Sequence, residues 1–348
     1  MMTKGIAIKI LSKDAQKIIT KLKANNNLDI DYKISRDSMN VIIPVKKITT
    51  DIKKYPIIEL SKKTVNNKIG ATIKDLLLRK KVPEEIVSQI PTSYDIVGDI
   101  VIANINPAIV KKYKKEIGEG YIEIHPHVKV VLNKKKEHHG VFRTQDLSYV
   151  YGEKRKETII KENGCLFKTD VEKVFYSLRL STERARIVSL VKPGEVVGVF
   201  FAGVGPFAIT IAKNSSPKEV IAIELNPIGV EYLKENIKLN KVEGKVIPIL
   251  GDVKKVCKKY KDYFNRIPMP LPKSAELFLD SAIFSIRNGG VIHLYSFVSK
   301  DNPYTELENI IKQKEKENKV KLKIIERRII RSFSATTVQV VLDVQVKK

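Results

Sequence analysis

The chain has 348 residues and is 43% hydrophobic, which is enough for two or three domains with their own cores. Its 64 lysines and arginines outnumber its 39 acidic residues, and the resulting net charge of +25 attracts polyanions. No apolar run reaches the roughly eighteen residues of a transmembrane helix, and the first residues do not resemble a secretory signal, so we expect neither a membrane-spanning nor a secreted protein.

The cysteines and the distribution of charge indicate a cytoplasmic RNA-binding protein. Two cysteines, Cys165 and Cys257, cannot form a disulfide framework, so we expect a reducing cytoplasm. We also expect a monomer. Basic residues occur along the whole chain, and 13 tyrosines and 11 phenylalanines are available to stack on bases. A lysine-rich composition without nucleic acid is the alternative. Membrane-surface binding is disfavoured, because no strongly amphipathic basic helix stands alone.

The first 61 residues predict a small β-α-β-β module. Strands are expected at 5–11, 32–34 and 41–45, and a helix at 13–24, with turn residues at 36–38. The charged stretch 61–68 is interpreted as a linker.

Residues 69–163 predict a second small α+β domain. A helix is expected at 73–78 and another after Pro107, and residues 94–105 are typical of a strand pair bent at Gly98 and Asp99. The segments that follow include a strand at 128–132, a charged loop at 134–140, and two stretches, 147–151 and 157–161, that lead to a turn at 163–164.

Residues 164–348 alternate apolar strands with helical segments, which predicts a parallel sheet covered on both faces. The last two strand-like runs, 322–330 and 337–346, have no helix between them. Such an antiparallel pair closes the Rossmann-like α/β sheet of class I methyltransferases. The expected strands are 196–201, 220–223, 246–250, 266–269 and 290–295, and the expected helices are 183–191, 207–213, 227–240, 274–286 and 302–313.

The glycine-rich turn 201–207 joins the first of these strands to a helix and is typical of a nucleotide-type cofactor site. Gly203 and Gly205 can take positive φ, and Glu224 ends the next strand, where a carboxylate can bind both hydroxyls of a ribose. Pro206 and Phe207 would crowd a diphosphate, which favours S-adenosylmethionine over a dinucleotide. A dinucleotide site and a turn without ligand stay as alternatives.

Two further loops of this block carry candidate ligand contacts. Asp252 follows the third strand and could accept a hydrogen bond from an adenine amino group, or it could simply cap a turn. The prolines in 270–273 predict a stiff loop at the carboxyl edge of the sheet, where ligands bind, although a helix-entry turn is also compatible.

Glu183 is the leading acid–base candidate, because it begins the helix that precedes the first strand. A glutamate there also complements the helix dipole, and that dipole would keep it ionised, as a proton acceptor must be. Three arginines, Arg143, Arg179 and Arg186, lie near the junction between residues 69–163 and residues 164–348. Each could bind phosphate or an oxygen that gains charge during the reaction, or could form an ordinary surface ion pair.

The histidines predict no metal site. They lack cysteine or carboxylate partners at the spacing of a zinc site, and neither a Ser-His-Asp arrangement nor a Walker loop is visible. The histidines considered are His125, His127, His138 and His139.

In combination, these residues resemble one family: the archaeal and eukaryotic tRNA (guanine-N1)-methyltransferases that modify guanine 37, next to the anticodon. The likeness covers nearly the whole chain and is specific as a combination. The segments that carry it are 93–99, 140–143, 174–180, 182–186, 201–207, 224–227, 236–240 and 270–273.

The resemblance implies S-adenosylmethionine as methyl donor, tRNA as substrate and a role for each matching residue. Glu183 matches the general base, Arg143 the arginine that steadies the guanine oxygen, and Arg179 a further active-site arginine. The implied cofactor contacts are Phe201, Ala202, Gly203, Val204, Gly205, Glu224, Leu225, Asp252 and Pro270. The implied substrate contacts are Phe175, Tyr176, Arg186, Leu271, Pro272 and Lys273.

The resemblance also implies a role for each of the two smaller domains. At three positions this sequence differs from the family. The first domain would touch the outer corner of the tRNA, and the middle domain would contribute to tRNA binding and to the active site. Val199 stands where the family has an acid, Pro270 where it has Asn, and Leu178 where it has Pro. None of these departures removes the candidate base.

Two other functions are compatible with the same residues. One is a tRNA enzyme of the wyosine pathway that methylates a ring carbon or transfers an aminocarboxypropyl group on a modified guanine. The other is a catalytically inactive tRNA-binding protein, for which Val199 is the motive.

Overall fold

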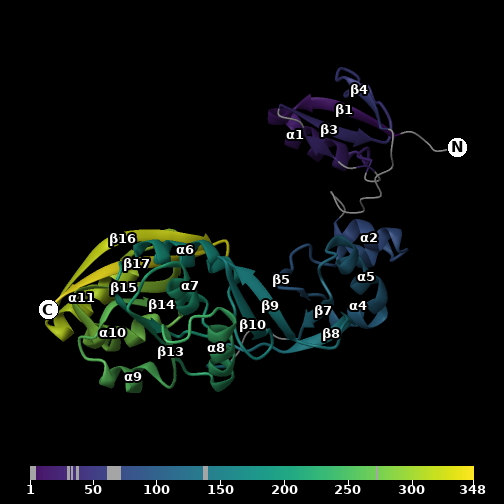
Figure 1. Ribbon diagram of the computed structural model, residues 1–348. Coiled ribbons are helices and arrows are strands. Elements are labelled where there is room, and N and C mark those ends of the chain that lie inside the picture. Colours follow the sequence, from purple (N-terminus) through teal and green to yellow (C-terminus); the bar gives the residue numbers. More distant parts are fainter. Residues whose placement is uncertain are drawn as a thin grey trace. The chain divides into compact units, whose positions relative to one another are not determined.

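The computed structural model describes residues 5–29, 32, 34–36, 39–60, 72–135, 140–271 and 273–348 (Figure 1). The chain forms two compact units. One comprises Met1–Asp95, Val101–Asn133 and Ser148–Lys154, and the other comprises Ile96–Ile100, Lys134–Leu147 and Arg155–Lys348. The predicted linker at 61–68 lies outside the described residues, so the predicted domain limits stay a prediction.

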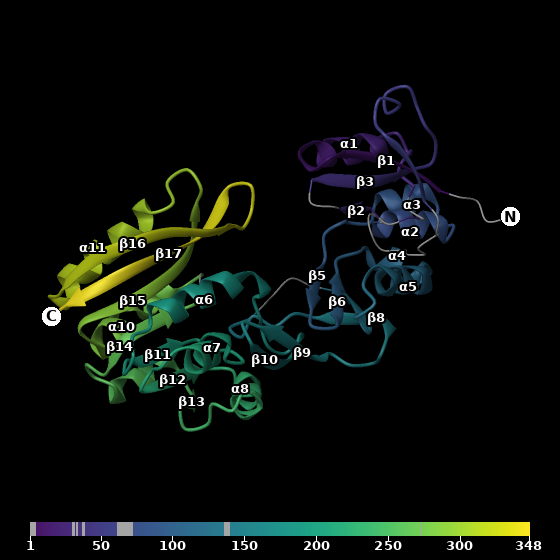
Figure 2. The ribbon, with the colours of Figure 1, turned by 45° about the horizontal axis from the view of Figure 1, so that its top comes forward.

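The N-terminal part of the first unit is an antiparallel sheet in the order β2-β3-β1-β4, with α1 packed along it (Figure 2). Ile8 and Ile10 of β1 alternate with outward residues and pack with Leu22 of the helix, as the period-two and period-3.6 patterns require. The strand expected at 32–34 is wrong in position: the strand that pairs with β3 is at 35–36, and its second residue overlaps the expected turn at 36–38. The elements are β1 (Gly5–Leu11), α1 (Ser12–Ala24), β2 (Ser35–Arg36), β3 (Asn40–Val45) and β4 (Ile57–Leu60).

Residues 72–154 contain helices and a second sheet in the order β5-β6-β7-β8. The predicted helix after Pro107 is two helices, because the backbone at Tyr113 leaves the helical region with φ −118° and ψ 35°. The hairpin bend at Gly98 and Asp99 is confirmed. The elements are α2 (Ile73–Arg79), α3 (Glu84–Ser88), β5 (Asp95–Val97), β6 (Ile100–Ala103), α4 (Pro107–Lys112), α5 (Lys114–Ile124), β7 (Val130–Lys134) and β8 (Leu147–Gly152).

The second unit contains the hairpin of β9 (Glu157–Glu162) and β10 (Cys165–Asp170), which is fixed to two helices. Arg184 on α6 (Ser181–Leu190) binds both carboxylate oxygens of Glu162 at 2.6 Å. Asn236 lies in α8 (Pro227–Leu239), and Asn240 is the C-cap of this helix. Both side chains bind backbone groups of β10 in the way a neighbouring strand would. The hairpin therefore docks against the helix that carries Glu183.

The core of this unit is a seven-stranded sheet in the order β13-β12-β11-β14-β15-β17-β16. Its first five strands are parallel, and β17 pairs antiparallel with β15 and β16, so the predicted methyltransferase-type sheet is confirmed. The strand order reverses between β11 and β14, and ligands of such sheets bind at the carboxyl ends of the strands at this point. The strands are β11 (Val196–Phe200), β12 (Glu219–Glu224), β13 (Val246–Leu250), β14 (Phe264–Met269), β15 (Ile286–Ser299), β16 (Lys321–Ser332) and β17 (Thr337–Lys347).

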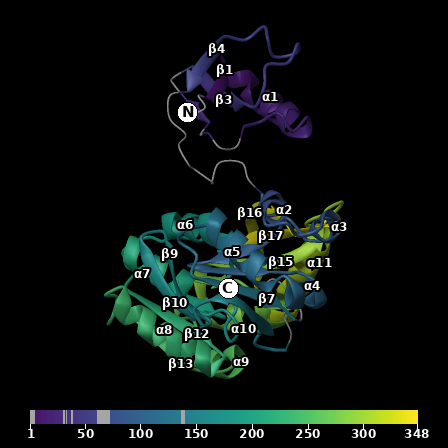
Figure 3. The ribbon, with the colours of Figure 1, turned by 90° about the vertical axis from the view of Figure 1, so that its right-hand side faces the viewer.

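Helices cover both faces of this sheet, α6, α7 and α8 on one and α9, α10 and α11 on the other (Figure 3). The buried strands are apolar on both faces: Val196 and Phe200 pack in the core of the second face, while Val199 between them is also fully buried. The single helix expected at 274–286 is wrong, because the segment splits into a 3-10 turn Ala275–Phe278 and α10. The remaining helices are α7 (Pro206–Asn214), α9 (Val253–Val256), α10 (Leu279–Ser285) and α11 (Thr305–Asn318).

Replacing Arg184 by leucine should lower the free energy of unfolding by roughly 3–5 kcal/mol, because the buried Glu162 carboxylate loses its guanidinium. The two side chains are 1% and 8% exposed. Urea denaturation measures the loss. Arg327→Leu is the matched control, since Arg327 is 46% exposed in its pair with Glu308 and should cost less than about 1 kcal/mol. Equal losses in the two variants would contradict a structural role for the buried pair.

Candidate functional site

The glycine-rich turn lies at the carboxyl end of β11, beside the point where the strand order reverses. Phe201, Gly203 and Gly205 have positive φ values of 60°, 55° and 94°. The backbone N–H of Ala202 donates to Ile223 of β12 at 2.9 Å, which fixes the turn to the next strand. Helix α7 then begins at Pro206, and its first turn leaves backbone N–H groups unpaired by the helix itself.

The two glycines of the turn serve different purposes. A methyl group on Gly205 would collide with Leu233 and would lie 2.9 Å from Ile209, so this glycine allows α7 and α8 to pack closely. A methyl group on Gly203 would meet only the carbonyl oxygen of Phe175, at 3.8 Å. The backbone at Gly203 is therefore open to a ligand.

Glu224 ends β12 and faces the same turn. Its two carboxylate oxygens accept hydrogen bonds from the backbone N–H groups of Gly203 and Asn226, both at 2.7 Å. Burial raises the pKa of Glu224, against the opposing effect of these donors. Each oxygen keeps a lone pair for a ribose hydroxyl, and Leu225, 42% exposed, offers an apolar surface beside it. The chemistry of this set fits the adenosine part of S-adenosylmethionine.

The loops predicted to complete the cofactor site have identifiable local roles. Asp252 accepts from the backbone N–H of Lys254 at 2.8 Å and caps α9, so the capping alternative describes the bond that is seen. The backbone N–H of Leu271 donates to Met269 at 2.8 Å, and its side chain packs on the sheet core. Lys273 is exposed, Pro270 is half-buried, and the predicted contact Pro272 lies outside the described residues.

Arg143 and Phe175 lie near the turn. The guanidinium of Arg143 stacks 4.4 Å from the centre of the Phe175 ring, and Arg143 has a positive φ of 54°. Burial lowers the pKa of Arg143 from its usual value. Because the carbonyl of Phe175 lies next to Gly203, these contacts place a cation close to the cofactor turn.

Glu183 lies in the first turn of α6 and is 3% exposed. Its carboxylate accepts from the Tyr295 hydroxyl at 2.8 Å and from the Arg186 guanidinium at 2.7 and 2.9 Å. The Tyr295 ring lies 6.0 Å from that of Phe207, in the first turn of α7. The predicted base is thus buried and ion-paired, and it does not extend into solvent.

Arg186 is shared by two buried carboxylates. Besides Glu183, it donates to Asp343 of β17 at 2.7 Å. Burial alone would lower the pKa of Arg186, but the bonds to Glu183 and Asp343 outweigh it and raise the pKa. Burial would likewise raise the pKa of Asp343, yet His293 and Arg186 hold it far below its usual value. The substrate contact predicted for Arg186 therefore competes with two internal partners.

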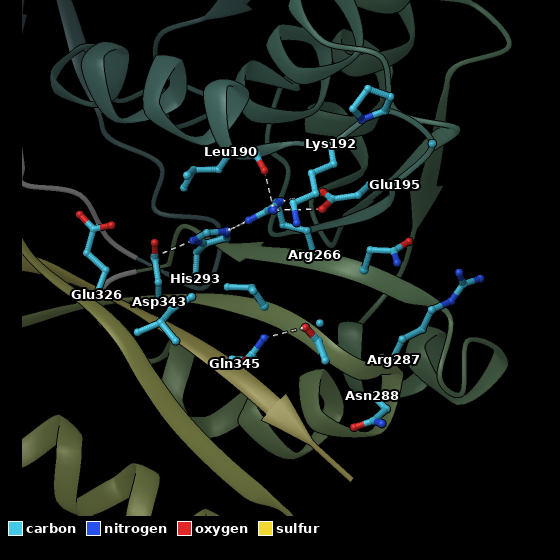
Figure 4. A pocket seen from close by; sticks show the side chains of 17 residues that line it. Leu190, Lys192, Glu195, Arg266, Arg287, Asn288, His293, Glu326, Asp343 and Gln345 are labelled. Atoms are coloured by element: carbon cyan, nitrogen blue, oxygen red, sulfur yellow. Dashed lines mark hydrogen bonds and ion pairs between the residues drawn. The ribbon is translucent and has the colours of Figure 1, made fainter.

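The network continues through His293 to Arg266 and Glu195 (Figure 4). His293 contacts Asp343 through Nδ1 at 2.6 Å and Arg266 through Nε2 at 2.8 Å. Since an arginine can only donate, Nε2 must be the acceptor and Nδ1 must carry the proton, so His293 is neutral. Burial lowers the pKa of His293 and keeps it in this form. Arg266 is in turn compensated by Glu195 at 2.9 Å.

The sequence analysis singled out Glu183 and Arg186, which lie in this network, but it did not single out Tyr295, His293 and Asp343. A signal for Asp343 was present, because it is a lone acid in the apolar run 337–346. Its partner His293 could not be inferred, since the two strands that bring them opposite each other are about fifty residues apart.

Two other predicted residues have different surroundings. The Tyr176 hydroxyl donates to Glu162 at 3.1 Å, and its ring packs near Val204 of the turn. Tyr176 therefore helps to hold the turn in place. Arg179 is exposed in the short 3-10 helix Leu178–Leu180, directly before α6.

Among the described residues, no group of three or more histidines, cysteines and acids is arranged to hold a metal ion. In the same part of the chain, no helix has the length and apolarity needed to cross a membrane.

Three protein families match successive parts of the chain. The tRNA methyltransferase 5 N-terminal domain matches residues 7–53, the TYW2 N-terminal domain matches 73–155, and the TRM5/TYW2 methyltransferase domain matches 158–323.

Three relatives match this chain along nearly all of their own length. The tRNA (guanine(37)-N(1))-methyltransferase Trm5b of Pyrococcus abyssi is 39% identical over 98% of this chain and 99% of its own. Trm5b of Methanocaldococcus jannaschii is 38% identical over 99% of both. The tRNA(Phe) (4-demethylwyosine(37)-C(7)) aminocarboxypropyltransferase of M. jannaschii is 38% identical over 73% of this chain and 98% of its own.

Solved structures agree with these relations. The crystal structure of Trm5b from P. abyssi has a TM-score of 0.73 at 37% identity and covers 99% of both chains. The complex of aTrm5 with tRNALeu has a TM-score of 0.69 at 37% identity, covering 98% of this chain and 99% of that one. M. jannaschii TYW2 in complex with AdoMet has a TM-score of 0.58 at 33% identity, covering 74% and 100%.

Replacing Gly205 by alanine should destabilise the unit and abolish binding of S-adenosylmethionine, because a side chain there meets Leu233 and Ile209 at a φ of 94°. We expect a loss of at least roughly 2 kcal/mol from strain and overpacking together. Gly203→Ala is the matched control for stability, since it has room and should cost only about 1 kcal/mol of backbone strain. Calorimetric binding and thermal unfolding measure both effects, and equal unfolding temperatures would contradict this assignment.

Proposed function

The chain belongs to the TRM5/TYW2 methyltransferase family, and we propose that it transfers a methyl group from S-adenosylmethionine to N1 of guanine 37 of tRNA, next to the anticodon. The observation that carries this proposal is the match, along 98% or more of this chain, to relatives named for that reaction. Its net charge of +25 suits a tRNA substrate. We expect it to act as a monomer in the cytoplasm, without a metal ion.

The cofactor would be held by the turn 201–205, with Glu224 on the ribose hydroxyls and Leu225, Asp252 and Pro270 around the adenine. When bound, S-adenosylmethionine supplies an electrophilic methyl group on a sulfonium. The open backbone at Gly203 and the paired carboxylate of Glu224 support this placement. Val199, where the family has an acid, is fully buried in the sheet and therefore adds no polar contact.

Glu183 would act as the general base. Guanine N1 carries a proton and is a poor nucleophile until that proton is removed. A well-placed base contributes roughly 10²–10⁴-fold to such a step. Tyr295 and Arg186 hold the Glu183 carboxylate in one orientation beside the first turn of α7, which supports this role.

Asp343 would make proton uptake by Glu183 less costly. The two carboxylates and the one guanidinium between them sum to a charge of −1, which becomes 0 once Glu183 is protonated. Without Asp343, the same step would turn a neutral ion pair into a buried cation without compensation. His293 is neutral and Arg266 is paired with Glu195, so neither changes this balance.

Arg143 would stabilise the negative charge that moves onto O6 as N1 loses its proton. Its guanidinium is ordered on the Phe175 ring next to Gly203, so it needs little reorganisation. Arg179, exposed before α6, would be a further contact to the substrate. The target guanine must leave its stack, and Phe175 together with the loop 270–273 would hold it.

The wyosine-pathway alternative has a relative of its own at 38% identity, but that relative covers only 73% of this chain. Mass spectrometry of an unmodified transcript after incubation with labelled S-adenosylmethionine tests the proposal. We expect N1-methylguanine at position 37. A tricyclic or carbon-methylated product would favour the wyosine pathway, and no product would favour an inactive tRNA-binding protein.

Glu183→Gln should lower the single-turnover rate of methyl transfer by about 10²-fold or more while leaving tRNA and cofactor binding nearly unchanged. The amide can still bind Tyr295 but cannot take up the proton. Rapid-quench kinetics and equilibrium binding measure the two properties. A variant with the turnover of the native protein would remove Glu183 from the role of base.

Asp343→Asn should reduce the single-turnover rate of methyl transfer by roughly tenfold, because proton transfer to Glu183 then leaves the Arg186 cation without a buried carboxylate partner. Rapid-quench kinetics measures the rate. Glu326→Gln is the matched control, because Glu326 is 3.8 Å from Arg186 but 45% exposed, and it should change the rate less than about twofold. Equal rates for the two variants would contradict the charge balance.

A further inference from the structure

A cavity of about 290 Å³ opens beside the loop that follows β14. Its volume is at the lower end of the range in which proteins bind small molecules, roughly 300–1,000 Å³. We call it the side cavity. Its principal lining residues are Lys273, Glu276, Phe297, Val298, Leu307 and Phe333.

The side cavity lies at the carboxyl edge of the sheet, on the strand that also carries the partner of the candidate base. Met269, the last residue of β14, pairs with Leu294 of β15, so the residues after Leu294 extend beyond the end of β14. Tyr295 binds Glu183, and Phe297 is two residues further along the same strand. Two residues of a strand span about 7 Å and point to the same face. One nucleotide step could therefore link the two places.

An aromatic pair forms one wall of the side cavity. The rings of Phe297 and Phe333 have centroids 4.3 Å apart and an interplanar angle of 41°. Phe333 is 50% exposed, and the guanidinium of Arg331 lies 5.5 Å from its centroid. An exposed ring backed by a second ring and a cation is the kind of platform on which single-stranded bases stack.

One residue that lines the side cavity, Glu276, has an acceptor that nothing in the described chain satisfies. The Oε2 atom of Glu276 is buried and has no hydrogen-bond partner among the described residues. Leaving such an oxygen without a donor is costly, and it calls for a ligand that supplies one. A phosphate would be repelled by this carboxylate, whereas the N–H edge of a base would bind it.

We propose that the side cavity binds the base of a nucleotide that directly flanks the methylated guanine, stacked on Phe333 and donating an amino N–H to Glu276. This inference rests on the proposed function. Guanine, adenine and cytosine all carry an exocyclic amino group. Uracil has only an imino N–H between two carbonyl oxygens that oppose a carboxylate. The cavity therefore selects an amino-bearing base over uracil at one flank of the target.

The test uses tRNA transcripts that carry each of the four bases at either flank of the target guanine, with steady-state and single-turnover kinetics. For the native chain, uridine at one flank should raise the KM for tRNA about tenfold, with kcat nearly unchanged. Phe333→Ala should raise the KM about tenfold for every transcript. Glu276→Gln should remove the penalty for uridine, because an amide can also donate to a carbonyl.

Phe284→Ala is the matched control, since Phe284 is 41% exposed on α10 and does not line the side cavity. Its KM should stay within twofold of the native value, and unfolding temperature and cofactor affinity verify that each variant is folded. Absence of a flanking-base effect in the native chain, or a Phe333→Ala variant equal to Phe284→Ala, would overturn the inference. If the native chain makes no N1-methylguanine at all, the proposed function itself fails.

Discussion

Two buried carboxylates, Glu183 and Asp343, share the guanidinium of Arg186, and the proposed chemistry depends on that arrangement. A carboxylate paired only with an arginine is held in its charged form and is a poor proton acceptor. A second carboxylate on the same arginine changes this, because the protonated state of the cluster is then neutral. The neutral tautomer of His293 preserves the balance by adding no charge of its own.

The fold brings this cluster to the cofactor turn from distant parts of the chain. Glu183 and Arg186 come from α6, Tyr295 and His293 from β15, and Asp343 from β17. The antiparallel return of β17 places Asp343 directly opposite His293. The C-terminal strand pair, which distinguishes this sheet from a dinucleotide-binding one, therefore also supplies the second carboxylate that binds Arg186.

The sequence predicted the fold of residues 164–348 well, because strand–helix alternation and a glycine-rich turn are local patterns. It also placed Glu183 in the first turn of a helix, but it did not predict that Glu183 would be buried and bound to Arg186. What it could not predict depends on pairing between remote strands, as with His293 and Asp343, or on packing. Arg184 is an example. In the sequence it resembles any other charged residue, but in the fold its buried pair with Glu162 docks a hairpin. Short elements such as β4 and α3 were missed because four or five residues show no clear periodicity, and β4 depends on its pairing with β1.

The proposed reaction depends on the Glu183 carboxylate, which would remove the N1 proton of the target guanine. The most direct measurement is the single-turnover methylation rate for transcripts whose target purines have progressively more acidic N1 positions, in the native chain and in Glu183→Gln. If Glu183 takes the proton, the rate difference between the two proteins should shrink steadily as N1 becomes more acidic. A constant ratio across the series would show that the carboxylate serves some other purpose.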